Sequence, residues 1–229
     1  MLLNEESLST WRRQAAEASG GTSSDDIYST IEETLVDYQL GGSILDYGAG
    51  IGNLSKRLLS MGRFETFYAA DLMDKPHGLD GVAWLKADLN DPIQGYDSYF
   101  DVVVAAEVIE HLENPRSMVR DMFRLCRPGG YLVLTTPNNE SLRAIISLLA
   151  RGHYVAFNDG CYPAHITALL RKDLSRILLE AGFRPPSFRF AQKGAVPGFT
   201  QFTWQGASYG LLRGARFSDG VLAVTQKPI

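Results

Sequence analysis

The sequence predicts an α/β protein built on a mostly parallel sheet. Up to residue 140, short apolar runs alternate with stretches whose apolar residues recur at helical spacing, which is typical of strand–helix–strand units with right-handed crossovers. One apolar run ends at Tyr47 and leads into the glycine-rich turn 48–52, which precedes a predicted helix over 53–60. A strand, a glycine turn and a helix in this order indicate a nucleotide-binding βα unit.

Residues 1–42 are expected to form a helical cap ahead of this unit. A first helix is predicted over 5–18 and is broken by a Gly-Gly pair. A second helix is predicted after Ser23-Ser24, because serine caps helix N-termini and two aspartates follow in the first turn. The pair Gly41-Gly42 ends this helix, and the first strand is expected to begin at Ser43.

Residues 43–138 are predicted to hold the cofactor-binding core. After the glycine turn the chain contains further apolar runs that are short enough to be strands. These predicted strands lie near 65–70, 82–86, 100–106 and 131–136. A helix is predicted from Ser117 to Arg127, and the turn Pro128-Gly129-Gly130 ends it before the last of these strands.

Residues 139–229 are predicted to form the acceptor side of a single domain that spans 1–229. Helices are expected over 141–151 and 171–181, and the last two strands over 187–192 and 221–226. The insertion 193–220 is rich in glycine and aromatic residues. A segment of this length within a compact domain usually has a function or structure of its own.

Asp46 decides which kind of nucleotide the glycine turn can bind. Dinucleotide sites place a pyrophosphate on the helix N-terminus that follows such a turn. Asp46 lies two residues before Gly48 and would repel that pyrophosphate, but it would attract a ligand with an ammonium group and no phosphate. S-adenosylmethionine has an α-amino group and a cationic sulfonium, so it is the expected cofactor, held at Gly48, Ala49 and Gly50.

Two further acids close the next two predicted strands. Asp71 follows an apolar run and is expected to accept hydrogen bonds from both ribose hydroxyls, with Leu72 beside it. Asp88 is expected to accept a hydrogen bond from the adenine amino group, and Leu89 is expected to supply an apolar contact. A lone aspartate is usually a solvated loop residue. Three acids at the ends of three successive strands form a much more specific pattern.

These blocks make the chain resemble a class I S-adenosylmethionine-dependent methyltransferase from about Ser43 to Asn138. The resemblance implies a Rossmann-like, seven-stranded, mostly parallel sheet with its last strand antiparallel and helices on both faces. The segment 101–112 is similar to the corresponding segment of ubiquinone-pathway O-methyltransferases. By this resemblance Glu107 would lie beside the methionine part of the donor, and His111 would face the methyl group.

The chemistry expected at His111 is removal of a proton from a hydroxyl acceptor. Methyl transfer needs positioned reactants and a base, and a neutral histidine suits that task. His165 in the loop after Tyr162-Pro163 is the second candidate catalytic residue. The alternative for His111 is a packing role against the cofactor.

A metal site is a second hypothesis for the same residues. On a helical turn, Glu107, Glu110 and His111 would share one face, and His165 could add a fourth ligand to a divalent cation. This spacing is similar to the Glu-x-x-Glu-His motif and distant histidine of metal-dependent small-RNA 2′-O-methyltransferases. The acceptor would then be a sugar or RNA-terminal diol. A third hypothesis is that the chain is a non-enzymatic module that binds S-adenosylmethionine.

Composition and charge limit which kinds of binding partner are expected. The 229 residues are 45% hydrophobic and 21% charged with a net charge of −4, values ordinary for a globular protein, and no basic run points to nucleic acid. The chain has no apparent signal or transmembrane segment, so a cytoplasmic location is expected. Residues 141–229 hold 11 Lys and Arg against 4 Asp and Glu. A hydroxylated small molecule or glycan, with or without a phosphate, is therefore the expected acceptor.

Overall fold

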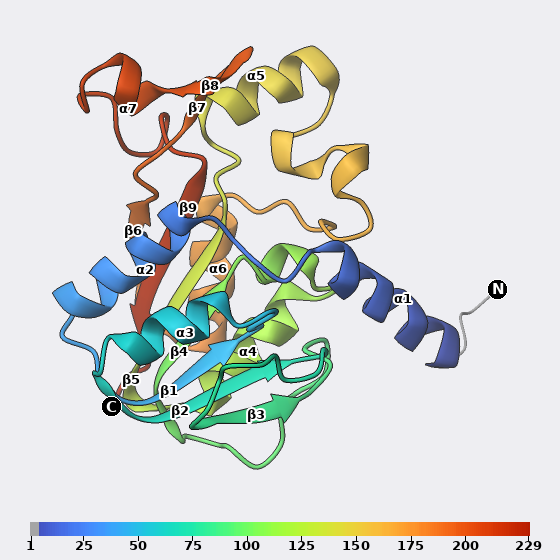
Figure 1. The fold of residues 1–229 in the computed structure, drawn as a ribbon, viewed down its shortest axis with the longest axis vertical. Coiled ribbons are helices and arrows are strands. Elements are labelled where there is room, and N and C mark those ends of the chain that lie inside the picture. The colour runs from blue at the N-terminus through green and yellow to red at the C-terminus, as the bar shows by residue number, and fades with distance from the viewer. Residues whose placement is uncertain (1–4) are drawn as a thin grey trace.

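The computed structural model describes residues 5–229 and contains a seven-stranded sheet (Figure 1). The strand order is β3-β2-β1-β4-β5-β9-β6. Neighbouring strands are parallel except β9, which runs antiparallel to both β5 and β6 and lies between them. The predicted mostly parallel sheet with an antiparallel last strand is confirmed. The strands are β1 (Gly42–Tyr47), β2 (Phe64–Asp71), β3 (Val82–Lys86), β4 (Phe100–Ala106), β5 (Cys126–Pro137), β6 (Ser187–Phe190) and β9 (Gly220–Gln226).

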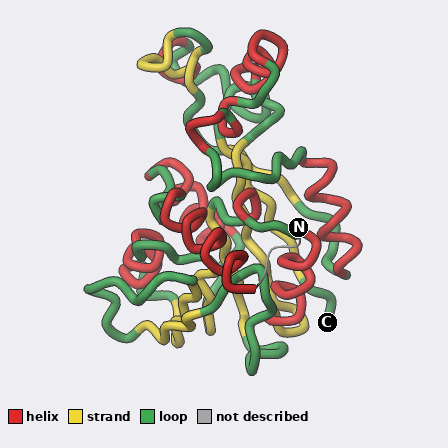
Figure 2. Tube along the Cα trace, turned by 90° about the vertical axis from the view of Figure 1, so that its right-hand side faces the viewer, coloured by secondary structure: helices red, strands yellow, loops and turns green. Residues whose placement is uncertain are grey.

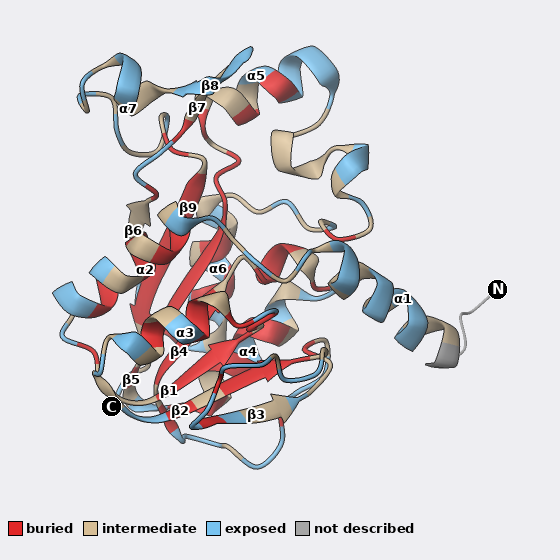
Figure 3. Cartoon of the chain, viewed as in Figure 1, coloured by how far each residue is buried: buried red, intermediate tan, exposed pale blue. Residues whose placement is uncertain are grey.

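Helices cover both faces of this sheet (Figure 2). On one face α2 (Asp25–Asp37) and α3 (Asn53–Ser60) pack their apolar residues against Ile44 and its neighbours. On the other face α4 (Pro115–Leu125) and α6 (Arg171–Ala181) pack against Leu45 and its neighbours. Consecutive strand residues point to opposite faces, so burial on both sides explains why the strands read as continuous apolar runs. Figure 3 shows these central strands buried along most of their length.

The strand order also fixes where polar side chains gather. β1 pairs with β2 on one side and with β4 on the other, so the order in which strands are added to the sheet reverses between β1 and β4, although the two strands are parallel. Ligands bind at the carboxyl ends of strands at such a switch point. Asp46 lies near the end of β1, Asp71 ends β2 and Glu107 follows β4, which brings these three acids to one edge.

The predicted helix over 117–127 is wrong at both ends. Helix α4 begins at Pro115, because Asn114 caps it by accepting a hydrogen bond from the Ser117 backbone N–H at 3.0 Å. It ends at Leu125, because Cys126 already pairs with Phe100 of β4. The strand β5 therefore starts before the glycine pair, and an irregularity in the register near Phe100 accommodates it.

Residues 142–161 and the elements of the insertion 193–220 lie beyond the end of the sheet, at the top of Figure 1, whereas the rest of residues 139–229 includes two strands of the sheet and a helix packed on it. The insertion 193–220 has structure of its own, as predicted. Gln205 stabilises it by accepting a hydrogen bond from the Gly194 N–H and donating to the carbonyl oxygens of Leu212 and Phe217. Its elements are β7 (Ala195–Val196), β8 (Phe199–Thr203) and α7 (Trp204–Ala207), and beside it lie α5 (Leu142–Arg151) and the 3₁₀ turns η2 (Val155–Phe157) and η3 (Asp159–Cys161).

Within residues 5–229, no helix is both long and apolar enough to cross a bilayer. The helical cap expected over 1–42 divides into two parts with different positions. Helix α2 packs on the sheet, whereas α1 (Glu5–Ala18) lies apart from it at the pocket described below. Residues 1–4 of that predicted cap lie outside the described residues.

A buried carboxylate ties the α4 face of the sheet together. Asp121 accepts hydrogen bonds from the Tyr47 hydroxyl at 3.4 Å and the Ile93 N–H at 3.2 Å. Its other oxygen pairs with the Arg124 guanidinium at 2.6 Å. The Asp121 side chain is buried, so removing it leaves the Ile93 N–H without this acceptor and takes one acceptor each from Tyr47 and Arg124, in a place that water reaches poorly.

We expect Asp121→Ala to lower the free energy of unfolding by about 3 kcal/mol, because one partner of a buried charged network is lost. Urea denaturation followed by circular dichroism measures this. Asp97→Ala is the matched control, since Asp97 also pairs with Arg124 but its side chain is 71% exposed. Equal losses in the two variants would contradict the assignment of this network to the core.

Candidate active site

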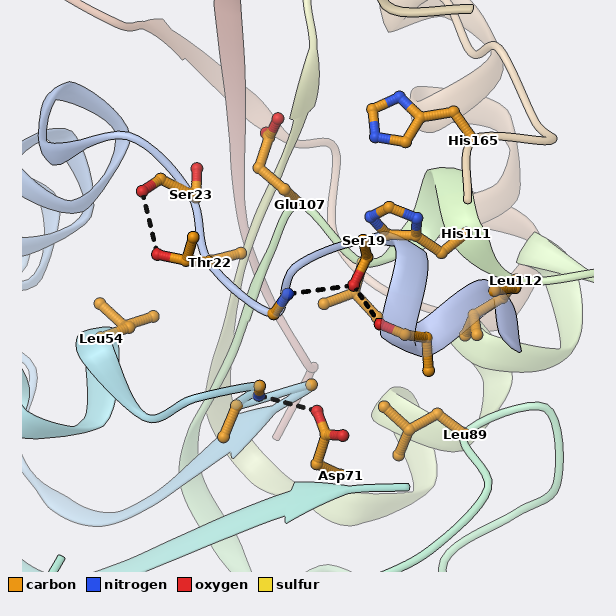
Figure 4. A pocket seen from close by; sticks show the side chains of 18 of the residues that line it. Ser19, Thr22, Ser23, Leu54, Asp71, Leu89, Glu107, His111, Leu112 and His165 are labelled. Atoms are coloured by element: carbon orange, nitrogen blue, oxygen red, sulfur yellow. Dashed lines mark hydrogen bonds between the residues drawn. The ribbon is translucent and has the colours of Figure 1, made fainter. Parts of the chain in front are cut away.

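A pocket of about 1000 Å³ opens at the carboxyl ends of β1, β2 and β4. Its volume is at the upper end of the range of about 300–1,000 Å³ for ligand pockets, so it has room for a donor and an acceptor together. Helix α1 and the segment that follows it form one wall, and residues 162–166 contribute to another. Figure 4 shows Asp71 and Leu89 at one end of this pocket, and His111, His165 and Glu107 at the other.

The glycine turn is shaped by close contacts that exclude side chains. A Cβ on Gly48 would lie 2.4 Å from Val108, and a Cβ on Gly50 would lie 2.1 Å from the carbonyl oxygen of Gly21. Both glycines also have positive φ angles, 87° and 53°. The Ile51 N–H donates to the same Gly21 oxygen at 2.9 Å, so the segment after α1 crosses directly over the turn. Gly48, Ala49 and Gly50 all line the pocket, and their contact with the donor stays a prediction.

Asp46 is a buried carboxylate, and one of its two oxygens has no hydrogen-bond partner. Its Oδ2 accepts a hydrogen bond from the Ser55 hydroxyl at 2.5 Å, and its Oδ1 is buried with no partner. Burial raises the pKa of Asp46 to about 7, the Ser55 hydrogen bond opposes this, and the nearby Asp71 charge adds to it. A cation in the pocket would favour the ionised form, so Asp46 is suited to the ammonium group expected from the sequence.

Asp71 is held in place by the backbone around it. Its Oδ2 accepts from the Gly50 N–H at 2.7 Å and its Oδ1 from the Met73 N–H at 2.9 Å. A carboxylate oxygen can accept two hydrogen bonds, so each oxygen keeps a site for a ligand hydroxyl. Leu72 and Leu89 line the same end of the pocket.

Asp88 also lines the pocket, but with a partner that the sequence did not predict. Its Oδ1 accepts from the backbone and side-chain N–H groups of Asn90. Its Oδ2 accepts from the guanidinium of Arg12 in α1 at 3.0 Å. The predicted adenine contact therefore faces a helix that crosses the mouth of the site.

The two candidate histidines lie edge to face at the other end. Their ring centroids are 4.7 Å apart. His111 Nδ1 lies 2.9 Å from the carbonyl oxygen of Ala164, and His165 Nδ1 lies 2.6 Å from that of Ala156. A carbonyl only accepts, so both rings carry the proton on Nδ1, and Nε2 is the acceptor nitrogen of each neutral ring. Burial lowers the pKa of both histidines, which keeps them neutral at pH 7.

Two carboxylates lie beside this histidine pair. Burial raises the pKa of Glu107 to about 7, and its Oε1 has no partner. Burial and the neighbouring Glu107 raise the pKa of Glu110, whose Oε2 accepts from Thr136 while its Oε1 is unpaired. Ligand atoms of Glu110, His111 and His165 lie within 4.8 Å of one another. Glu107 lines the pocket but is not part of that group.

Several pocket residues were not predicted as site residues. Trp11 and Arg12 come from α1, and Lys193 comes from the insertion. A signal for the α1 contribution was present, because Leu8, Trp11, Arg12 and Ala15 recur at helical spacing ahead of a glycine pair. Lys193 reaches the pocket only through the path of the insertion, which no local pattern encodes.

The strand order, the glycine turn and the acids at its edge define a class I S-adenosylmethionine-dependent methyltransferase. The chain belongs to the methyltransferase-domain family, whose family model it matches over residues 24–186. S-adenosylmethionine is therefore its cofactor, as predicted.

Among curated proteins, the chain is 30% identical to a ubiquinone biosynthesis O-methyltransferase of Xanthomonas oryzae pv. oryzae strain PXO99A. That match covers 61% of this chain and 67% of the relative. The chain spans about half the length of other relatives with the same name.

Solved structures share the fold over the whole chain. One is a chain of the complex between the Haloferax volcanii Trm112 methyltransferase activator and a protein described as a methyltransferase, with a TM-score of 0.66, 16% identity and 100% of both chains covered. Another is the Burkholderia thailandensis 1,6-didemethyltoxoflavin-N1-methyltransferase with bound S-adenosylhomocysteine. It gives a TM-score of 0.65 at 14% identity, over 100% of this chain and 92% of that one. At these identities the likeness establishes the fold alone.

The pKa of Asp46 predicts how donor affinity depends on pH. In the free protein this carboxyl holds a proton below pH 7, and that proton competes with the donor ammonium group. We expect the Kd for S-adenosylmethionine to rise up to about tenfold for each pH unit below 7, and to change little from pH 7 to about 7.5, where the α-amino group of the donor still holds its proton. Calorimetry between about pH 5.5 and 7.5 measures this. Methylthioadenosine is the control ligand, since it lacks the amino group, and an equal pH dependence for both ligands would refute the contact.

We expect Asp71→Ala to weaken binding of S-adenosylmethionine by about 2–3 kcal/mol, because charge-assisted hydrogen bonds to the ribose are lost. Asp74→Ala is the matched control, since Asp74 lies three residues on and its side chain is 87% exposed. Calorimetry on both variants separates a site effect from a general charge effect. Unchanged affinity in a folded Asp71→Ala variant would remove Asp71 from the donor site.

Proposed function

We propose that this methyltransferase transfers the methyl group to a hydroxyl oxygen of a small molecule or glycan. The observation that carries this proposal is the histidine pair at the end of the pocket opposite Asp71. Two neutral imidazoles whose Nδ1 atoms are bonded to backbone carbonyls have Nε2 as the nitrogen that accepts a hydroxyl proton at neutral pH. The likeness to O-methyltransferases of ubiquinone biosynthesis supports the same class of acceptor.

When bound, S-adenosylmethionine supplies an activated methyl group whose carbon–sulfur bond breaks as the acceptor oxygen attacks. The residues of the chain position the two reactants for this in-line displacement. Asp71 and Asp46 would hold the ribose and the amino group, which directs the methyl group toward His111 and His165. One Nε2 would then take the hydroxyl proton, and the carbonyl on Nδ1 would stabilise the imidazolium that forms.

The acceptor end of the pocket favours a partly apolar compound with an anionic group. Tyr162 and Ile166 lie near His165 in the chain and provide apolar surface, and Lys193 adds a positive charge to the lining of the pocket. The basic balance of residues 141–229 supports an anionic acceptor such as a carboxylate or phosphate. These features support a small molecule more than nucleic acid, since the positive charge is spread rather than clustered.

The second candidate function is metal-dependent methylation of a sugar or RNA-terminal diol. It is favoured by the grouping of Glu110, His111 and His165, whose ligand atoms lie within 4.8 Å of one another, and by an unpaired buried oxygen on Glu110. Carboxylate and imidazole ligands suit Mn²⁺, Fe²⁺ or Zn²⁺, which would orient two adjacent hydroxyls and lower their pKa. The backbone carbonyls on both Nδ1 atoms are the partners usual for metal-bound histidines.

A panel of hydroxylated acceptors with labelled donor tests the proposal and separates its two forms. We expect product whose mass rises by one methyl group, and a loss of about 10²–10⁴-fold in kcat for His111→Ala, since general bases contribute on that scale. The surface variant His77→Ala is the control. Full activity in His111→Ala would refute both forms.

Adding a chelator distinguishes a metal-free histidine base from a divalent metal site. Activity that survives excess chelator supports the metal-free base. Activity that is lost with chelator and restored by a divalent cation supports the metal site, and His165→Ala should then raise the cation concentration required without changing donor affinity. Donor binding with no product from any acceptor would instead favour the reading that the chain only binds S-adenosylmethionine.

A further inference from the structure

We propose that α1 is a lid over the adenosine half of the donor site and that Arg12 is the latch that holds it closed. Arg12 is then a donor-positioning residue that sets how fast S-adenosylmethionine enters and S-adenosylhomocysteine leaves. This inference rests on the proposed placement of the donor, with adenine at Asp88. It concerns contacts that α1 itself makes in this chain.

The covering face of α1 is continuous. Leu8, Trp11, Arg12 and Ala15 all line the pocket, and their spacing places them on one side of the helix. Most of these side chains are small or apolar. The helix therefore presents a smooth surface to the ligand space and one charged group, Arg12.

Arg12 joins α1 to three acids on the opposite rim of the pocket. Its guanidinium lies 3.0 Å from Asp88, 2.9 Å from Glu113 and 3.6 Å from Asp91. The contact with Glu113 uses two nitrogens and both carboxylate oxygens, the bidentate geometry in which arginine pairs are strongest. The Arg12 side chain is only 17% exposed. Arg13, its neighbour in sequence, is exposed, and its charge acts on the exposed Asp74 instead of on Asp88.

The chain offers a hinge directly after α1. A Cβ placed on Gly20 would meet no atom within 4 Å, and its φ angle is 71°. The next residue is fixed, because the Gly21 carbonyl oxygen accepts from the Ile51 N–H and its backbone lies against Gly50. Gly20 donates its N–H to the Glu17 carbonyl oxygen of α1 and has open space around it, whereas the chain is anchored to the glycine turn from Gly21 onward. A rotation at Gly20 would lift α1 without disturbing the glycine turn.

Arg12 pairs with Asp88, the same carboxylate that is proposed to accept a hydrogen bond from the adenine amino group. Asn90 occupies Asp88 Oδ1, so the adenine must share Oδ2 with Arg12. One oxygen can accept both hydrogen bonds, so a bound adenine and a closed α1 are compatible. The donor cannot leave through this side while Arg12 remains paired. Since Asp91 and Glu113 are partly exposed, salt should weaken the latch.

Stopped-flow dissociation of S-adenosylhomocysteine tests this proposal with the full chain. We expect Arg12→Gln to raise the dissociation rate by about tenfold, the scale of a small network of partly exposed ion pairs. The wild-type rate should rise with salt between about 50 and 500 mM, and the Arg12→Gln rate should change little. Glu113→Gln should give a smaller increase and leaves Asp88 intact. Arg13→Gln is the matched control and should behave as wild type.

A dissociation rate in Arg12→Gln equal to that of wild type would overturn the latch, as would equal increases in Arg12→Gln and Arg13→Gln. Far-ultraviolet circular dichroism checks that each variant is folded. Failure of the proposed donor placement gives a different result, because Asp71→Ala would then leave the equilibrium Kd unchanged. A weakened Asp71→Ala variant together with an unchanged Arg12→Gln rate would refute the latch alone.

Discussion

The central constraint on this molecule is the burial of carboxylates at one edge of the sheet. Among the described residues, each buried carboxylate oxygen without a hydrogen-bond partner belongs to Asp46, Glu107 or Glu110. Ionised groups in such positions are costly, and their pKa values rise in consequence. A protein keeps such groups where a ligand compensates them. Two kinds of partner could offset the buried negative charge. A cationic donor could do so at Asp46, and a proton or a metal ion could do so at Glu110.

The fold meets this constraint by bringing the ends of β1, β2 and β4 together at the point where the strand order reverses. The glycine turn lets the donor approach the backbone, and it also lets the segment after α1 pass over the turn at Gly21. That second contact places α1 above the site. The same acids that would bind the donor therefore also hold the covering helix, so donor binding and closure are linked through Asp88 and Arg12.

The sequence predicted what depends on local patterns. Alternating apolar runs predicted the parallel sheet, and the spacing of Asp46, Asp71 and Asp88 predicted an acidic edge that the structure assembles. The start of β5 was missed, because Cys126 joins the sheet through pairing with Phe100, and a glycine pair reads locally as a turn. Arg12 was missed as a site residue for a similar reason, since its partners lie at least 76 residues away in the chain. Contacts of that kind follow from the fold and not from the local sequence.

The proposed methyl transfer requires one orientation of the donor, with its ribose at Asp71 and its sulfur facing His111 and His165. A crystal structure of the protein with S-adenosylhomocysteine tests this most directly. The account predicts both ribose hydroxyls within hydrogen-bond distance of Asp71, the amino group beside Asp46 Oδ1, and the sulfur on the side of the two histidines. A ligand bound with its adenine toward His111 and His165, or with its sulfur toward Asp88, would contradict the account.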